Sequence, residues 1–339
     1  MPSRARTYTW ELVLGVILLG TIAFNLSESS GYLGVDNFVN LFQLHIEKVI
    51  VVVMMTFVIV SGEIDLSVAS VMAWSAAVLA TLHERGEPLG LAILVALVAA
   101  GAAGLIHGWC VAKLGLPSLV VTLAGLIGWR GAARVLVEDR SIGNFPRWFD
   151  RLGQDDLVGP MPVAVVIFFV LFAVGWVVLQ RSTAGRVLYV IGDNAEVARY
   201  SGVDVARTRL VLFTASSVVA GMAGILFAAR LGSTRGDLAS GFELEIITIV
   251  LLGGVSIFGG SGRMSGVLLA VLIVLNLRNG FGLANVGGNT QIGVIGSILI
   301  MSVVAQNLID RFGSRSRAPG PPTAAGMATP AQPAGATGA

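Results

Sequence analysis

The sequence predicts an all-α fold, a polytopic transmembrane helical bundle with about ten spans. Three observations lead to this prediction. Hydrophobic residues make up 55% of the 339 residues and charged residues only 12%, about half of the roughly 25% charge of a soluble domain. The mean hydropathy is +0.83. Long stretches without Asp, Glu, Lys or Arg recur along most of the chain.

The candidate spans follow from the length that a bilayer demands, because a helix needs about 20 mostly apolar residues to cross it. The charge-free stretches of useful length are 12–27, 49–62, 66–82, 88–112, 114–129, 157–180, 210–229, 246–262, 264–277 and 279–309. The second stretch is short. We expect it to begin near Phe38 and to hold Glu47 and Lys48 close to a membrane surface, where long side chains snorkel.

The distribution of charge predicts the orientation. With the N-terminus in the cytoplasm, the loop 137–160 lies outside and carries five acidic residues against three arginines. Taken together, the predicted inner segments hold eleven arginines and one lysine, in agreement with the positive-inside rule. These segments are 1–9, 63–65, 113–116, 181–209, 259–263 and the tail from Asp310. An even number of spans then places both termini in the cytoplasm.

The chain divides into a transmembrane domain, 1–317, and a tail, 318–339. The tail contains Ala, Gly, Pro and Thr with no charge and almost no large apolar residue. Such a segment buries too little surface to fold, so we expect a disordered cytoplasmic tail. Within the domain, the loop 181–209 is the one sizeable polar connection on the predicted inner face. The polar break Ser61–Asp65 weakly resembles Gly259–Arg263, and we infer nothing from this likeness.

Several classes of function are disfavoured by composition. Cys110 is the only cysteine, so the chain forms no internal disulfide and no Cys metal cluster. His45, His83 and His107 share no metal-ligand spacing, and no nucleophile–base pair is recognisable. The net charge of +2 gives no reason to expect a nucleic-acid partner. We therefore expect neither an enzyme nor a cofactor.

The loop 181–209 encodes a short helix. Asp193-Asn194-Ala195-Glu196 has the pattern of a capping box, the next residues up to Ser201 are compatible with a helix, and Gly202 follows as a residue that can take a positive φ. A helix of about two turns is marginal in water alone. It needs a surface, and the membrane domain and a cytosolic partner both offer one. Val197, Tyr200 and Val203 could face either surface.

Several segments resemble the ribose/xylose/galactoside permease family of ATP-binding-cassette importers. They occur in the family's order over residues 40–305 and are Thr56–Ser70, Leu116–Leu123 with Arg130-Gly131, Gly185–Val203, Glu243–Glu245, Leu252–Ser256, Gly259–Gly262 and Asn279-Gly280. Glu63 and Ala69 stand where the family has glycines, and Val197 replaces an alanine.

The resemblance implies that the short helix is a coupling helix, which passes nucleotide-driven motion from an ATPase subunit to the spans. The residues that match the family's loop, and that we expect to serve this contact, are Arg186, Asn194, Glu196, Ala198, Arg199, Gly202 and Val203. The chain has no Walker A pattern, so ATP hydrolysis belongs to another polypeptide.

The resemblance also implies further partners and a location. These are a cytoplasmic ATPase subunit, a second permease subunit that is either a copy or a paralogue, a periplasmic or lipoprotein sugar-binding protein, and membrane lipid. The location is the bacterial cytoplasmic membrane. The function it predicts is monosaccharide import, for a sugar such as ribose, xylose or rhamnose. The alternatives are import of autoinducer-2-type furanosyl signals, branched-chain amino acids or nucleosides by the same architecture, or an ion-coupled secondary transporter.

Polar residues in the apolar stretches are candidates for the translocation path: Asp65, Thr122, Arg130, Asn276 and Asn279. Each also has a structural interpretation. Asp65 precedes a predicted helix and could cap it, Arg130 could snorkel to the outer surface, and the others could join helices to each other, which such residues do more often.

Overall fold

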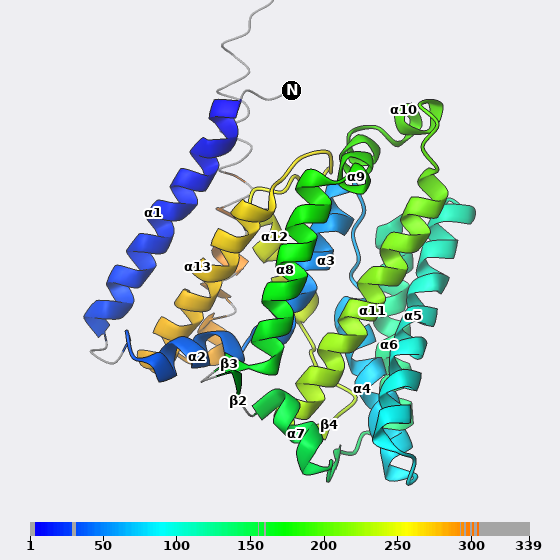
Figure 1. The fold of residues 1–339 in the computed structure, drawn as a ribbon, viewed down its shortest axis with the longest axis vertical. Helices are drawn as coiled ribbons and strands as arrows, with labels where there is room; N and C mark the ends of the chain where they lie inside the picture. Colours follow the sequence, from blue (N-terminus) through cyan, green and yellow to red (C-terminus); the bar gives the residue numbers. More distant parts are fainter. Residues whose placement is uncertain are drawn as a thin grey trace, which may run out of the picture.

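The computed structural model describes residues 4–28, 32–154, 156–158, 161–291, 293–294, 296–298, 300–301 and 304. The predicted tail 318–339 lies outside them, as does the end of the predicted domain. The helices are α1 (Arg4–Glu28), α2 (Val35–Gln43), α3 (Ile46–Val60), α4 (Val68–Glu84), α5 (Leu89–Lys113), α6 (Ser118–Val137), α7 (Arg147–Gln154), α8 (Val163–Arg181), α9 (Thr183–Asp193), α10 (Ala195–Tyr200), α11 (Val205–Leu231), α12 (Phe242–Leu252) and α13 (Met264–Leu283) (Figure 1).

The helical bundle confirms the membrane-protein class. Among the described residues, six helices are long and apolar enough to cross a membrane: α1 from Thr9, α5, α6, α8, α11 and α13. Three further predicted spans fall on the shorter helices α3, α4 and α12. The last predicted span, 279–309, begins inside α13 and continues into residues that are described only in part. The count of ten and the side of the C-terminus therefore stay predictions.

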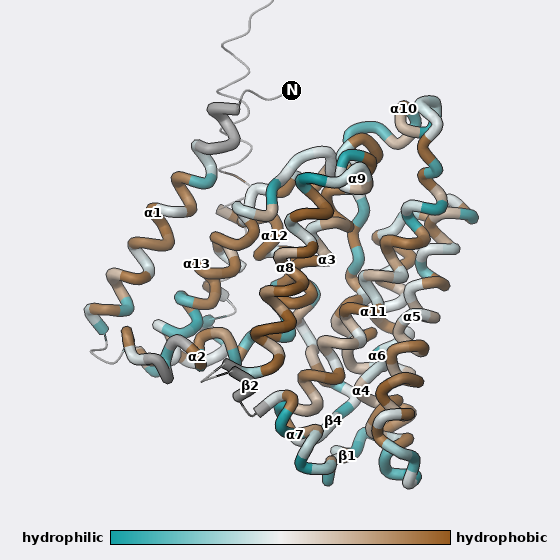
Figure 2. Tube along the Cα trace, in the orientation of Figure 1, coloured by the Kyte–Doolittle hydropathy of each residue, from teal (hydrophilic) through white to brown (hydrophobic). Residues whose placement is uncertain are grey.

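The segments predicted to lie inside gather at one end of the bundle, and the predicted outer loop lies at the other (Figure 1). Figure 1 places the start of α1, the segment α9–α10 and the loop between α12 and α13 at one end, and α7 at the other. In Figure 2 both ends are hydrophilic, and the lengths of α1 and α8 between them are mostly hydrophobic. We refer to the end with α9 and α10 as the inner end.

Short strands qualify the all-α prediction. The strand β1 (Ile142–Gly143) pairs with β4 (Ser233–Thr234), and β2 (Asp156–Val158) pairs with β3 (Met161–Pro162), both antiparallel. They belong to the loops at the outer end (Figure 1). These strands are only two or three residues long. Such short strands show no alternation of apolar and polar residues from which the sequence could predict them.

The expected start of the second span near Phe38 is wrong. The helix α2 ends at Gln43, and His45, with φ of −134°, starts a separate helix, α3. Glu47 and Lys48 do not snorkel either, because only 1% and 4% of their surfaces are exposed.

Glu47 and Lys48 instead belong to a buried charge cluster. Glu47 pairs with Arg230 of α11 at 2.6 Å. Glu245 of α12 pairs with Lys48 at 2.8 Å and with Arg278 of α13 at 2.7 Å. The cluster ties four helices together, and it shows why the predicted boundary between 264–277 and 279–309 was wrong. Arg278 does not end a span but lies inside α13, where Glu245 neutralises it.

Two breaks interrupt the apolar segments. The segment 61–67 separates α3 from α4, and 253–263 separates α12 from α13. The predicted span 246–262 is therefore helical only to Leu252. Gly254, Gly259, Gly260 and Gly262 all have positive φ, a backbone that glycine adopts without steric cost and that cannot continue a right-handed helix.

Candidate coupling site

The helix α10 begins at a side-chain cap. Asn194 is the N-cap residue, and its Oδ1 accepts hydrogen bonds from the backbone N–H groups of Glu196 at 2.9 Å and Val197 at 3.0 Å. The expected capping box starting at Asp193 is wrong by one residue. Glu196 is the second residue of the helix, and its carboxylate is exposed.

The end of α10 is fixed by its glycine. Gly202 has φ of +84° and donates its N–H to the Arg199 carbonyl at 3.1 Å, while Val203 donates to the Ala198 carbonyl at 3.1 Å. This pair of bonds is a Schellman motif. The prediction that Gly202 ends the helix is confirmed, although the helix is one residue shorter than expected.

The two faces of α10 differ in polarity and exposure. Ala198 is fully buried and clusters with Ile191 of α9 and Val205 of α11, with Val203 packed alongside. On the opposite face Val197 is 54% and Tyr200 86% exposed. Glu196 and Arg199 flank them and are also exposed. The membrane domain therefore supports one face of α10, and the other presents apolar groups between two opposite charges.

Arg186 lies apart from this exposed face. It is on α9, where its Nη2 donates to the Thr183 hydroxyl at 2.8 Å.

The end of α9 touches both breaks through glycines. A Cβ on Gly192 would lie 2.0 Å from the Val60 carbonyl oxygen and 2.4 Å from the Gly260 nitrogen. A Cβ on Gly259 would lie 2.6 Å from Gly62 Cα. The Gly260 N–H donates to the Val60 carbonyl at 2.9 Å. The two breaks that weakly resemble each other in sequence are therefore in contact in the structure. They meet at Gly192, next to the residues that lead into α10.

Tyr189 adds a second link between α9 and the 253–263 break. Its hydroxyl donates to the Gly262 carbonyl at 2.8 Å. Burial raises the pKa of Tyr189 above its ordinary value, so the phenol stays protonated and keeps this donor near neutral pH.

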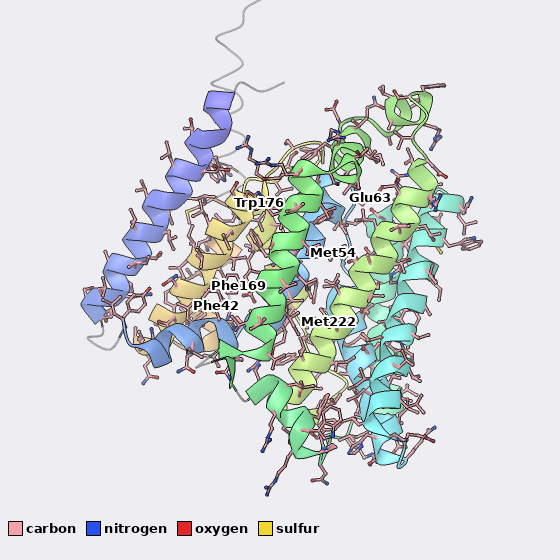
Figure 3. The ribbon with its side chains drawn as sticks, viewed as in Figure 1. Phe42, Met54, Glu63, Phe169, Trp176 and Met222 are labelled. Carbon is pink, nitrogen blue, oxygen red and sulfur yellow. The ribbon has the colours of Figure 1, made fainter. Side chains whose placement is uncertain are left out.

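The first turns of α11 hold the 61–67 break. Arg209 pairs with Glu63 at 2.6 Å, and Figure 3 shows Glu63 near the inner end, between α9 and α11. Two turns further on, the Ser216 hydroxyl donates to Asp65 Oδ2 at 3.0 Å. Since α11 begins just after α10, the same helix joins α10 to the break.

Asp65 is fully buried and anchors the break to several helices. Its Oδ1 accepts from the Ser67 N–H at 3.0 Å and from the Ser67 hydroxyl. The Ser67 oxygen lies 3.2 Å from His107 Nδ1, and Trp129 Nε1 donates to His107 Nε2 at 3.0 Å. An indole N–H only donates. His107 therefore accepts at Nε2 and, as the neutral tautomer, donates from Nδ1 to Ser67.

This geometry refines the capping interpretation of Asp65. The N-cap residue of α4 is Ser67, whose side chain makes no cap bond. Asp65 does not cap α4 itself but holds Ser67 in place by accepting hydrogen bonds from it. The other four path candidates also bind neighbouring segments. Thr122 donates to the Ile64 carbonyl and Arg130 to the Leu238 carbonyl, Asn276 accepts from Tyr32, and Asn279 is bonded to Asn37. A role on the path stays a prediction for all five.

Sequence reasoning missed Gly192, Arg209, Ser216 and His107. Arg209 was counted only as a charge on the inner side, and Gly192 only as part of a matching segment. Their partners are far away in the sequence, so no local pattern marks them. A glycine inside a short helix, at Gly192, was the one available signal for a close backbone contact.

Comparison with known proteins identifies the class. A family model described as the permease component of branched-chain amino acid transport systems matches residues 37–305. The chain belongs to this permease family. The permease is 35% identical to the autoinducer 2 import system permease protein LsrD of Yersinia enterocolitica (serotype O:8 / biotype 1B) over 312 residues, which are 89% of this chain and 93% of that protein.

Other relatives agree. The permease is 34% identical to the protein of the same name from Yersinia pseudotuberculosis (serotype O:3, strain YPIII) and to that from Yersinia pestis (strain Pestoides F), over 89% of this chain and 92% of each relative. No solved structure gives a significant match. The predicted family of importer permeases is thereby confirmed. The permease is a multi-pass transport subunit of the bacterial cytoplasmic membrane, and the ATPase is a separate chain.

Proposed function

We propose that this permease imports an autoinducer-2-type furanosyl molecule, as one subunit of an ATP-binding-cassette importer. The observation that carries the proposal is the similarity to permeases named for autoinducer 2 import, which extends over 89% of the chain. It favours the furanosyl alternative over ribose or xylose. Both substrate classes are small and rich in hydroxyl groups, which is why the motifs alone did not separate them.

The second part of the proposal is that α10 contacts the ATPase subunit. A two-turn helix that is capped at both ends and supported on one face is a rigid projection. Its free face combines Tyr200 and Val197 with the charges of Glu196 and Arg199. Aromatic residues and Arg are enriched in protein interfaces, and Tyr200 is the most exposed large apolar residue of the described chain.

The third part concerns selectivity, which we assign mainly to a substrate-binding protein outside the membrane. The polar residues named as path candidates already make hydrogen bonds to other segments of this chain. A path bounded by such residues, between this chain and a second permease subunit, needs few groups that recognise the substrate. The partners of the complex are thus a binding protein, a second permease and an ATPase.

A deletion strain tests the substrate. Uptake of autoinducer 2, ribose, xylose and leucine is measured in the wild type, in the deletion strain and in the strain with the gene restored. We expect the deletion to lower autoinducer 2 uptake alone. Loss of ribose or xylose uptake instead would return the assignment to monosaccharides, and loss of leucine uptake would assign branched-chain amino acids.

Site-directed cross-linking tests the contact. Cys110, on α5, is the only native cysteine, so a Cys110→Ala background accepts single cysteines. We expect Tyr200→Cys to cross-link to the ATPase subunit, and Leu12→Cys, on the exposed face of α1, not to do so. Glu196→Lys should abolish uptake while membrane insertion stays normal. A Tyr200→Cys variant that reacts with no other subunit would remove the assignment.

A further inference from the structure

A groove of about 710 Å³ lies between α8 and α11 at the inner half of the bundle. Its floor is α3, through Val53, Met54 and Phe57, and its roof is α9 with the segment that follows α10. Figure 3 shows Met54 between the ribbons of α8 and α11. On the rims Val174 of α8 is 55% and Val211 of α11 60% exposed, so the groove opens sideways between two membrane helices.

The length of the groove matches one leaflet. Along α11, beyond Arg207 at the mouth, the lining extends from Thr208 to Val219, eleven steps of about 1.5 Å each, which give a length of ~16 Å. The hydrocarbon core of a bilayer is about 30 Å thick, so one leaflet contributes half of it. The lining over this length is almost wholly aliphatic. An occupant that enters from the side therefore has the shape and polarity of an acyl chain.

The inner end of the groove carries positive charge. Arg207 lines it and is exposed, and Arg186 adjoins it by donating to Thr183, another lining residue. No carboxylate forms an ion pair with either guanidinium among the described residues. Asp204 also lines the mouth, where its Oδ1 accepts from the Arg207 backbone N–H at 2.9 Å. The mouth therefore has two arginines and one carboxylate, a net positive charge at the predicted cytoplasmic surface. Basic pockets between helices on that side bind anionic lipid head groups.

We propose that the groove binds an anionic phospholipid of the inner leaflet, with one acyl chain between α8 and α11 and the head group at Arg207 and Arg186. The occupant lies against Thr183–Leu188 in the first half of α9 and against Gly202–Thr208, the segment that joins α10 to α11 and begins α11. It fills the space that α8 and α11 would need in order to approach each other. Lipid occupancy thereby sets the separation of the two helices that flank the coupling segment.

Photolabelling of the assembled importer in vesicles tests the proposal. The probes are phosphatidylglycerol and phosphatidylcholine, each with a diazirine on the acyl chain, and labelled peptides are identified by mass spectrometry. We expect the phosphatidylglycerol probe to label the segments around Met54 and Val211–Val219. Ala215→Trp, which fills the groove, should remove this labelling, and Ala102→Trp, on the exposed face of α5, should leave it intact.

A head-group variant supplies the second arm. Arg207→Gln should lower labelling by phosphatidylglycerol about fivefold, because one Arg near an anionic surface contributes about 1 kcal/mol, and should leave phosphatidylcholine labelling unchanged. Equal labelling of all exposed helices, or labelling that survives Ala215→Trp, overturns the proposal. So does a Val211→Cys variant that cross-links to the second permease, since the groove would then be a subunit contact. Labelling requires neither substrate nor ATP, so its outcome is independent of the proposed transport function.

Discussion

Gly192→Ala is the sharpest test of the contact between α9 and the two breaks. The added Cβ would lie 2.0 Å from the Val60 carbonyl oxygen, whereas close C···O contacts in proteins are about 3.3 Å or longer. The backbone must move apart by roughly the difference, which is more than 1 Å. The same movement opens the hydrogen bond from Gly260 to Val60.

The expected magnitude follows from three contributions. Overpacking costs about 1–3 kcal/mol, and the lost hydrogen bond about 1 kcal/mol. Replacing a helical glycine by alanine returns about 0.5–1 kcal/mol. The net loss of stability is therefore about 1–3 kcal/mol, and it falls on the segment that supports α10.

Gly128→Ala is the matched control. Gly128 is also a helical glycine, on α6, but its added Cβ would meet nothing within 4 Å. Thermal unfolding of the purified full-length variants and uptake by the reconstituted importer provide the measurements. We expect Gly192→Ala to unfold at a lower temperature and to lose uptake, and Gly128→Ala to match the wild type or exceed it slightly. Equal behaviour of the two variants would refute the close contact.

Three further predictions concern other parts of the chain. Asn194→Ala removes the cap of α10 and should cost about 1 kcal/mol locally, with weaker cross-linking to the ATPase, and Asn194→Asp should retain both. Glu245→Gln leaves Lys48 and Arg278 buried without their carboxylate and should cost about 3–5 kcal/mol in thermal unfolding, whereas Glu84→Gln, in the exposed pair with Arg140, should cost less than about 1 kcal/mol. Ser216→Ala removes one bond to Asp65 and should cost about 1–3 kcal/mol, while Thr214→Ala, whose hydroxyl bonds within its own helix, should cost less.

The features that sequence predicted well are local ones. The helix at 195–200 depends on an Asn, a Gly and the few residues between them, and all of its capping bonds join residues within five positions. Long apolar helices such as α5 and α8 are equally local, since length and composition suffice to predict them. The assignment of the end of α10 to Gly202 succeeded for the same reason.

The features that sequence missed depend on distant partners. Glu47 and Arg230 are 183 positions apart. A search for charge-free stretches treats each charge as the edge of a span. Arg278 shows the error most clearly, because a buried carboxylate from another helix lets it lie inside α13. The contacts of Gly192 with Val60 and Gly260 were also unpredictable, since a glycine in the sequence does not reveal what approaches it.

The two supports of α10 differ in kind, and this difference bears on how motion reaches the spans. On the side of α9 the contact with the 61–67 break is backbone against backbone at Gly192, and the side-chain hydrogen bond of Tyr189 goes to the 253–263 break instead. On the side of α11 the contact is directed, through the ion pair of Arg209 with Glu63 and the hydrogen bond of Ser216 with Asp65. If α10 contacts the ATPase as proposed, we therefore expect a displacement of α10 to reach the 61–67 break mainly through α11, which makes both of these directed contacts. The groove between α8 and α11 lies beside this linkage, in the space through which α11 would have to move.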